Sequence, residues 1–219
     1  LHLSIRRQRQ MCIRDSTQSA FAFTKVGDNP ANAPKLISSS LFTTDCEGYG
    51  WLEVGNYRFY TPVQNKYADT NPYYGNNGSG GLVLNGTAIN VATAGYYYIK
   101  ANIGTTPTTF SVTASSWGIY GLATPRSTGL NKNMTYNQAT KKWEITILLS
   151  GGRAFKFRNS ALTSILGGFD ATKTGVDYAG TKMSYNGLDI ELPGTALTNY
   201  KVTLDLNTPR AYTYTLAIQ

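Results

Sequence analysis

Apolar and polar residues alternate along much of the chain, which predicts β-strands. Apolar side chains occupy every second position of residues 200–206, and residues 97–103, 142–149 and 212–218 show a similar period. Strands with one apolar and one polar face are typical of antiparallel sheets that pack against a core on one side. No helical period extends over ten or more residues. The pattern therefore predicts an all-β fold.

A weak internal repeat divides the chain into two similar halves. Each half runs through an aromatic-rich strand, a variable loop, a segment with an Asn-Gly pair and two further strands. The Asn-Gly pairs are turn signals: Asn85-Gly86 and Asn186-Gly187. We therefore predict two tandem antiparallel β-sandwich domains, residues 17–114 and residues 115–219. The first domain is expected to be incomplete at its start, because no alternating strand precedes residue 19.

The opening residues 1–16, LHLSIRRQRQMCIRDS, differ in composition from the rest of the chain. They hold four arginines, one of the two cysteines and the only histidine. One interpretation is a basic arm for nucleic acid or an anionic surface, and another is a solvated terminus. The segment RQRQMCIRDS also resembles the peptide translated from residual sequencing-adapter DNA. We therefore predict that residues 1–16 are absent from the natural protein and pack against nothing.

The remaining chain is low in charge and only mildly basic. Without residues 1–16 it has 16 basic and 11 acidic residues, against 20 and 12 in the whole chain. The lysines are mostly scattered singly, so we do not expect binding to nucleic acid. Histidine is the commonest metal ligand and general base, and it is missing after His2. No phosphate-binding glycine loop or paired carboxylates stand out, so we expect neither a cofactor nor an enzymatic activity.

Five motifs occur in order in the second half: WGIYGLATP, NMTY, KWEIT, GGRAFKFR and LGG, within residues 117–168. This order resembles the SusE/SusF-type outer-membrane lipoproteins of Bacteroidetes starch-utilisation systems. The first half also fits the family, through FAFTKVG, LEVGNYRFY and LNGTAINVATAGYYYIKANI. The resemblance thus covers residues 19–219.

The resemblance implies Ig-like β-sandwich domains and a surface-exposed protein that binds starch-like or related polysaccharide, with α-glucan first, without cleaving it. It implies attachment to the outer membrane only through a lipid anchor outside this sequence. Components of an outer-membrane glycan transporter are the implied protein partners. The alternative is a structural Ig-like spacer or adhesin-type module that has no sugar site.

The family combines aromatic platforms with Lys, Arg and Asn groups at its sugar sites. Carried over to the second half, the matching positions are Lys156, Arg158 and Asn159. Lys156 and Arg158 lie two apart on one strand, so both point away from the side of Phe155 and Phe157. The family has a Trp soon after this segment, where the chain has no aromatic residue before Phe169, and the equally weighted alternative is an ordinary charged strand face.

The first half has a candidate sugar site in the loop of residues 61–81. Tyrosine rings can pack against the C–H face of a pyranose, and nearby amide and lysine groups can bind its hydroxyls. The three candidates are Tyr67, Tyr73 and Tyr74. The alternative is a Gly/Asn-rich hairpin with incidental tyrosines.

Other aromatic residues are predicted to be structural. Trp117 and Trp143 alternate in phase with buried-type isoleucines, and Trp51 is assigned to the core by the repeat. The run of residues 96–98, three tyrosines, supplies either a sugar platform or a cross-strand aromatic pair. Cys46 is expected to be an incidental thiol in a polar turn.

Overall fold

The computed structural model describes residues 20–38, 45–64, 66–105, 108–125, 131–161, 164–168 and 183–219. The segment of residues 1–16 lies outside the described residues, as does residue Phe169. The described residues form nineteen β-strands and one three-residue 3-10 helix, η1 (Pro30–Asn32). The prediction of an all-β fold is confirmed.

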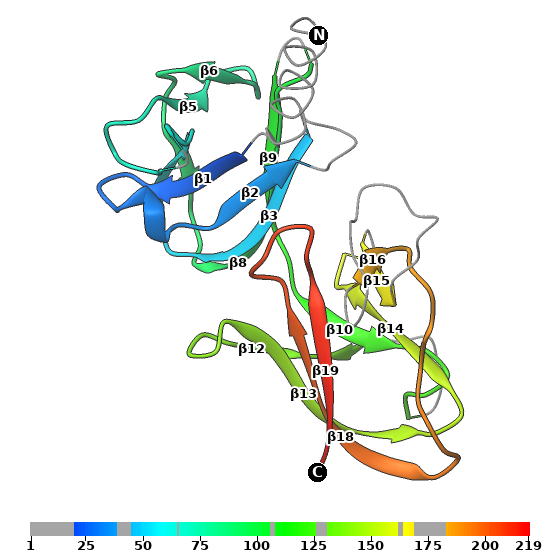
Figure 1. Ribbon diagram of the computed structural model, residues 1–219. Coiled ribbons are helices and arrows are strands. Elements are labelled where there is room, and N and C mark those ends of the chain that lie inside the picture. The colour runs from blue at the N-terminus through cyan, green and yellow to red at the C-terminus, as the bar shows by residue number, and fades with distance from the viewer. Residues whose placement is uncertain are drawn as a thin grey trace, which may run out of the picture.

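The first nine strands form one antiparallel sheet, which lies in the upper part of Figure 1. Its hydrogen-bonded order is β6-β5-β4-β1-β2-β3-β8-β9, and β7 pairs with β4. Their bounds are β1 (Ala20–Lys25), β2 (Lys35–Ser38), β3 (Asp45–Leu52), β4 (Gly55–Tyr60), β5 (Tyr73–Asn76), β6 (Leu82–Leu84), β7 (Ile89–Val91), β8 (Gly95–Asn102) and β9 (Thr109–Ala114).

The two edges of this sheet meet, so the sheet curls around its own core. Gly81 forms a β-bridge with Thr109, and the backbone N–H of Leu82 donates to the carbonyl of Thr108 at 3.2 Å. The Thr108 hydroxyl donates to the carbonyl of Leu82 at 2.6 Å. The enclosed core includes Phe23, Phe59 and Ile99. Closure removes open strand edges, which would otherwise be free to pair with another chain.

The second half contains two antiparallel sheets. The six-stranded sheet has the order β11-β10-β14-β15-β16, with β17 beside β14, and the four-stranded sheet has the order β12-β13-β18-β19. Their bounds are β10 (Trp117–Tyr120), β11 (Lys132–Asn133), β12 (Thr135–Asn137), β13 (Lys142–Ser150), β14 (Ala154–Asn159), β15 (Ile165–Gly168), β16 (Met183–Tyr185), β17 (Ile190–Glu191), β18 (Leu197–Asp205) and β19 (Thr213–Ile218).

Side chains of both sheets form one core in the second half. Trp117 and Phe157 come from the six-stranded sheet, and Trp143 and Val202 come from the four-stranded sheet. The predicted alternation of residues 200–206 is confirmed, because all four of its apolar side chains are buried. Core positions for Trp117 and Trp143 are confirmed as well. All strand pairs of the described residues lie within β1–β9 or within β10–β19.

The internal repeat appears as the same backbone arrangement in both halves. Asn85 has φ 58° and follows β6, and Asn186 has φ 53° and follows β16. Each donates its backbone N–H to the carbonyl of the first residue of the neighbouring strand, Tyr73 in β5 or Ile165 in β15. Each is followed by a glycine, and a Cβ on that glycine would clash with the backbone of the neighbouring strand. Asparagine tolerates the left-handed region and glycine allows close approach, so the two Asn-Gly pairs specify this turn.

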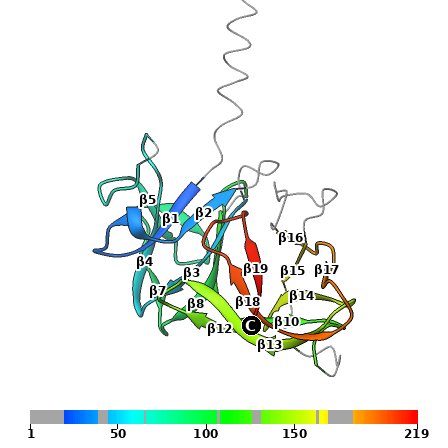
Figure 2. The same cartoon turned by 60° about the horizontal axis from the view of Figure 1, so that its bottom comes forward.

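The three consecutive tyrosines of β8 lie on opposite faces of the first sheet. Tyr97 packs against the core of the first half, whereas Tyr96 and Tyr98 contact the core of the second half. Tyr98 lies directly opposite Tyr49 of β3, and the two rings stack with centroids 4.5 Å apart. The run therefore supplies a cross-strand aromatic pair. Figure 1 and Figure 2 both show β3 and β8 on the side of the first sheet that is nearest to the second half.

A buried carboxylate joins the two halves. Glu47 of β3 is 3% exposed, and it accepts hydrogen bonds from the hydroxyls of Tyr98 at 2.6 Å and Tyr212 at 3.0 Å. The guanidinium of Arg210, from the second half, lies 4.0 Å from this carboxylate. Arg210 also donates to the carbonyls of Ile37 and Asp45 in the first half. We call Glu47, Tyr49, Tyr98, Tyr185, Arg210 and Tyr212 the Glu47 cluster.

Cys46 lies in β3 and is fully buried, so its placement in a polar turn was wrong. Burial raises the pKa of the Cys46 thiol to about 12, because an apolar surrounding disfavours the thiolate. The nearby guanidinium of Arg210 lowers the pKa by a smaller amount. The thiolate is the nucleophilic form, so this cysteine should be inert in the folded protein.

We expect native Cys46 to react with iodoacetamide at mildly alkaline pH at least about a thousandfold more slowly than in the unfolded chain. The measurement is mass-spectrometric labelling of a Cys12→Ser variant, with and without guanidinium chloride. Rapid labelling of the folded variant would show that β3 opens readily or that the thiol is not buried.

Candidate functional site

The outer face of the six-stranded sheet carries the two basic residues that the sequence singled out. Phe155 and Phe157 are buried, so Lys156 and Arg158 of β14 face away from the core, as predicted. The ammonium of Lys156 lies 3.1 Å from the carboxylate of Asp189, and the Lys156 side chain is 24% exposed. Two cationic donors of one strand thus share a face that solvent reaches.

Two residues that the sequence analysis did not select complete this face. Tyr120 of β10 lies opposite Lys156 in the strand register, and the Arg158 guanidinium lies over its ring, 4.2 Å from the centroid. The Nε of Arg158 donates to Oδ1 of Asn131 at 2.8 Å. We call Tyr120, Asn131, Lys156 and Arg158 the β14 face. Trp117 and Ile119 point to the core, and Tyr120 is the next residue of the strand, so its outward direction could have been predicted from the sequence.

Asn159 does not belong to the β14 face. The sequence grouped it with Lys156 and Arg158, but its side chain is only 6% exposed. Its Oδ1 accepts the backbone N–H of Ser164 at 3.0 Å and so fixes the turn after β14. Adjacent residues of a strand point to opposite faces, which places Asn159 on the inner side with Phe157. Asn159 therefore does not share a face with Lys156 and Arg158.

The three tyrosines of the first-half loop do not form one surface. Tyr74 packs inward against the first core, with its ring 6.0 Å from that of Phe21. Tyr73 has the Arg58 guanidinium 4.2 Å from its ring centroid. Tyr67 lies elsewhere, with the ammonium of Lys35 4.7 Å from its ring. Sugar contact therefore remains a prediction for Tyr67 and for Tyr73, each taken by itself. Tyr74 packs against the first core.

A groove between the two halves has the composition that was expected of a sugar site. From the first half it is lined by Trp51 and by residues of the η1 segment, and from the second half by Tyr136 of β12 and by residues that follow β12 and β18. Its volume is about 440 Å³, within the range of roughly 300–1,000 Å³ that is usual for ligand pockets. We call it the Trp51 groove; its lining residues are Asn32, Ala33, Pro34, Lys35, Tyr49, Gly50, Trp51, Tyr136, Gln138, Lys141 and Asn207.

Trp51 is not a core residue, so its assignment from the repeat was wrong. Its side chain is half-buried, packs against the edge of the second core and stacks on Tyr136, with parallel rings 5.7 Å apart. Its Nε1–H donates to Glu53 at 2.7 Å in an exposed hydrogen bond. The ring therefore lies at the wall of the groove, with its polar edge already satisfied by a neighbour.

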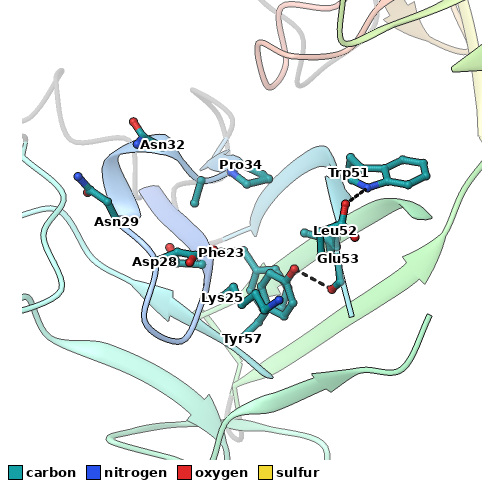
Figure 3. A pocket seen from close by; sticks show the side chains of 12 residues that line it. Phe23, Lys25, Asp28, Asn29, Asn32, Pro34, Trp51, Leu52, Glu53 and Tyr57 are labelled. Atoms are coloured by element: carbon teal, nitrogen blue, oxygen red, sulfur yellow. Dashed lines mark hydrogen bonds between the residues drawn. The ribbon is translucent and has the colours of Figure 1, made fainter. Parts of the chain in front are cut away.

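A second hollow of about 430 Å³ adjoins the Trp51 groove and shares four of its lining residues, Trp51 among them. Figure 3 shows Asn29 and Asn32 above this hollow, and Trp51 and Glu53 at its side. Tyr57 lies at its floor and donates its hydroxyl to the carbonyl of Glu53 at 2.8 Å. The two hollows therefore lie next to each other along the η1 segment.

The chain matches no model of a known protein family and no curated protein sequence.

The described residues show no metal centre and no membrane-spanning helix. In this part of the chain no three His, Cys, Asp or Glu side chains gather where they could hold a metal ion. Among the same residues, no helix is long and apolar enough to cross a membrane.

Proposed function

We propose that this protein binds a polysaccharide at the β14 face and does not cleave it. The observation that carries the proposal is the fixed arrangement of Lys156, Arg158 and Tyr120 on one solvent-facing side of the six-stranded sheet. Arg158 is held by Asn131 and by the Tyr120 ring, so little side-chain entropy remains to be lost when a ligand binds. Cationic N–H groups donate to sugar hydroxyls, and the tyrosine offers an apolar surface to the C–H groups.

The resemblance to SusE/SusF-type lipoproteins supports an α-glucan as the first ligand to test. On this proposal the protein is lipid-anchored at the cell outer membrane and holds polysaccharide near an outer-membrane glycan transporter. Individual sites would be shallow and weak, and several sites on one chain would raise the overall affinity for a polymer.

A double substitution tests the β14 face. We expect Lys156→Ala/Arg158→Ala to weaken binding to amylopectin at least about tenfold, because two charge-assisted hydrogen bonds are removed. Affinity electrophoresis and calorimetry measure the effect, with levan and xylan as comparison polymers. Lys201→Ala is the matched control, since Lys201 lies 3.1 Å from Glu144 on the four-stranded sheet, as Lys156 lies 3.1 Å from Asp189.

The second candidate function is a spacer or adhesin-type module without a sugar site. It is favoured by the partners of the two basic side chains, because Asp189 and Asn131 already bind them. Failure of any polysaccharide to retard the unmodified protein would support this alternative and contradict the proposal. Binding that survives the double substitution unchanged would remove the β14 face from the proposal.

A further inference from the structure

We infer that the Trp51 groove is a separate binding site for the pyranose rings of an oligosaccharide. It shares no residue with the β14 face. The inference does not rest on the β14 face, because the groove is built from different residues with their own geometry.

The wall of the groove presents aromatic surface to a ligand. Trp51 and Tyr136 come from different halves of the chain, yet their rings are parallel to within 2°. Tyr136 is fixed from behind by Tyr96, whose ring centroid lies 4.6 Å away, and by Trp143. Such a supported aromatic wall can take the C–H face of a sugar ring at low entropic cost, because its side chains are already ordered.

The polar lining of the groove matches hydroxyl groups. Asn32, Gln138 and Lys141 contribute side chains for which no hydrogen bond or ion pair to another described residue is found. Amide side chains both donate and accept hydrogen bonds, as sugar hydroxyls do. No carboxylate lines the groove within the described part of the chain, so an electron-rich sugar oxygen meets no repulsion there.

The same lining argues against a nucleotide, which would also stack on Trp51. A phosphate group needs several cationic donors, and two lysines line the groove. The ammonium of Lys35 is already bound by the carbonyls of Pro30, Ala31 and Ala33, each within 2.8 Å. Burial also lowers the pKa of Lys35, because a less polar surrounding disfavours the charged ammonium. Lys141 is then the one cation of the groove that remains available among the described residues.

A second hollow next to the groove offers further hydrogen-bonding groups. Trp51, Pro34, Ala33 and Asn32 border both hollows, and Figure 3 shows Asn29 and Asn32 at the second one. Asp28 and Glu53 line this second hollow and can accept hydrogen bonds from hydroxyls.

Tryptophan fluorescence can test the groove directly. Trp117 and Trp143 are 1% and 5% exposed, so of the three tryptophans Trp51 is the one that a bound sugar can reach. The probes are maltohexaose, cellohexaose, xylohexaose and mannohexaose, with adenosine monophosphate as the non-sugar probe. We expect at least one hexasaccharide to change the fluorescence of the unmodified protein saturably, and we expect no change in Trp51→Phe.

Two kinds of variant separate binding from folding. Calorimetry with the bound hexasaccharide should show a Kd that is at least about tenfold higher for Trp51→Ala, because this change removes the aromatic surface on which the sugar ring packs. Gln138→Ala and Lys141→Asn remove exposed polar groups without touching the core, and each should weaken the Kd about threefold or more. Asparagine is chosen at Lys141 because its φ of 55° is in the left-handed region, which asparagine tolerates.

The outcomes are distinguishable from those at the β14 face. Fluorescence-detected binding that persists in Lys156→Ala/Arg158→Ala supports the groove, whatever becomes of the β14 face. The inference is overturned if none of the hexasaccharides changes the fluorescence, or if Trp51→Ala, Gln138→Ala and Lys141→Asn all keep the unmodified Kd. Binding of adenosine monophosphate without binding of any hexasaccharide would also overturn it and would assign the groove to a nucleotide.

Discussion

Replacing Glu47 with alanine is expected to lower the free energy of unfolding by about 2–5 kcal/mol, because two buried tyrosine hydroxyls lose their acceptor and the Arg210 guanidinium loses one of its two acidic neighbours, Asp45 being the other. The Arg210 side chain is 11% exposed and lies 4.0 Å from Glu47. The hydroxyls of Tyr98 and Tyr212 would lose their acceptor in the same change, and each buried donor left without a partner adds to the cost. Urea unfolding followed by circular dichroism near neutral pH measures the effect.

Two further variants identify the cause of the loss. Glu47→Gln keeps an oxygen acceptor but loses the charge, so its cost should be smaller than that of Glu47→Ala. Glu191→Ala is the matched control, because Glu191 is an exposed glutamate of β17, and its loss should stay within about 0.5 kcal/mol. Equal stabilities for Glu47→Ala and Glu191→Ala would show that the Glu47 cluster does not hold the halves together.

The Glu47 cluster also bears on binding, since the Trp51 groove takes its walls from both halves. Tyr49 belongs to the cluster and lines the groove, and its hydroxyl lies 3.2 Å from that of Tyr185. A groove between two separately moving halves would lose its shape, whereas a buried, fully hydrogen-bonded link keeps the aromatic rings in place. Loss of Glu47 should therefore weaken binding in the groove more than binding at the β14 face.

The local pattern of apolar and polar residues was sufficient to predict the strands and much of the second core. The period of two placed Val202 and Leu204 on the buried side, and it placed Lys156 and Arg158 on the outer side. Side-chain direction in a strand depends only on sequence position once one face is known to be buried. The Asn-Gly turns were equally local, since their backbone angles suit these two residue types.

The remaining features depend on contacts between distant segments, which a local pattern does not encode. Closure of the first sheet depends on the pairing of Gly81 with Thr109, 28 positions further along the chain. Trp51 was assigned to the core from its place in the internal repeat, but the face it occupies meets the second half instead of the first core. Glu47 had no distinguishing signal, because its two tyrosine partners lie 51 and 165 positions away.

The expected result at alkaline pH is a steep loss of stability that begins near pH 10, the usual pKa of tyrosine. Burial raises the pKa values of Tyr49, Tyr96 and Tyr212 in the folded protein, because a low-dielectric surrounding disfavours the phenolate. Below about pH 10 these hydroxyls are protonated in both states, and their contribution to stability is fully present. Burial raises the pKa values of Tyr98 and Tyr185 in the same way. Above about pH 10 the unfolded chain loses the protons that these buried hydroxyls keep in the folded chain. The free energy of unfolding should then fall by about 1.4 kcal/mol per pH unit for each buried tyrosine.

Parallel measurement of tyrosinate absorbance and circular dichroism distinguishes this mechanism from general charge repulsion. The buried tyrosines should ionise only as the secondary structure is lost, so the two signals should change together above about pH 10. Lysines titrate in the same range, and a Tyr96→Phe variant separates the two causes. Removing one buried hydroxyl should reduce the slope by about 1.4 kcal/mol per pH unit, the value for a single proton. An unchanged slope in Tyr96→Phe, or a fold that persists well above pH 11, would contradict the assignment of alkaline unfolding to the buried tyrosines that join the two halves.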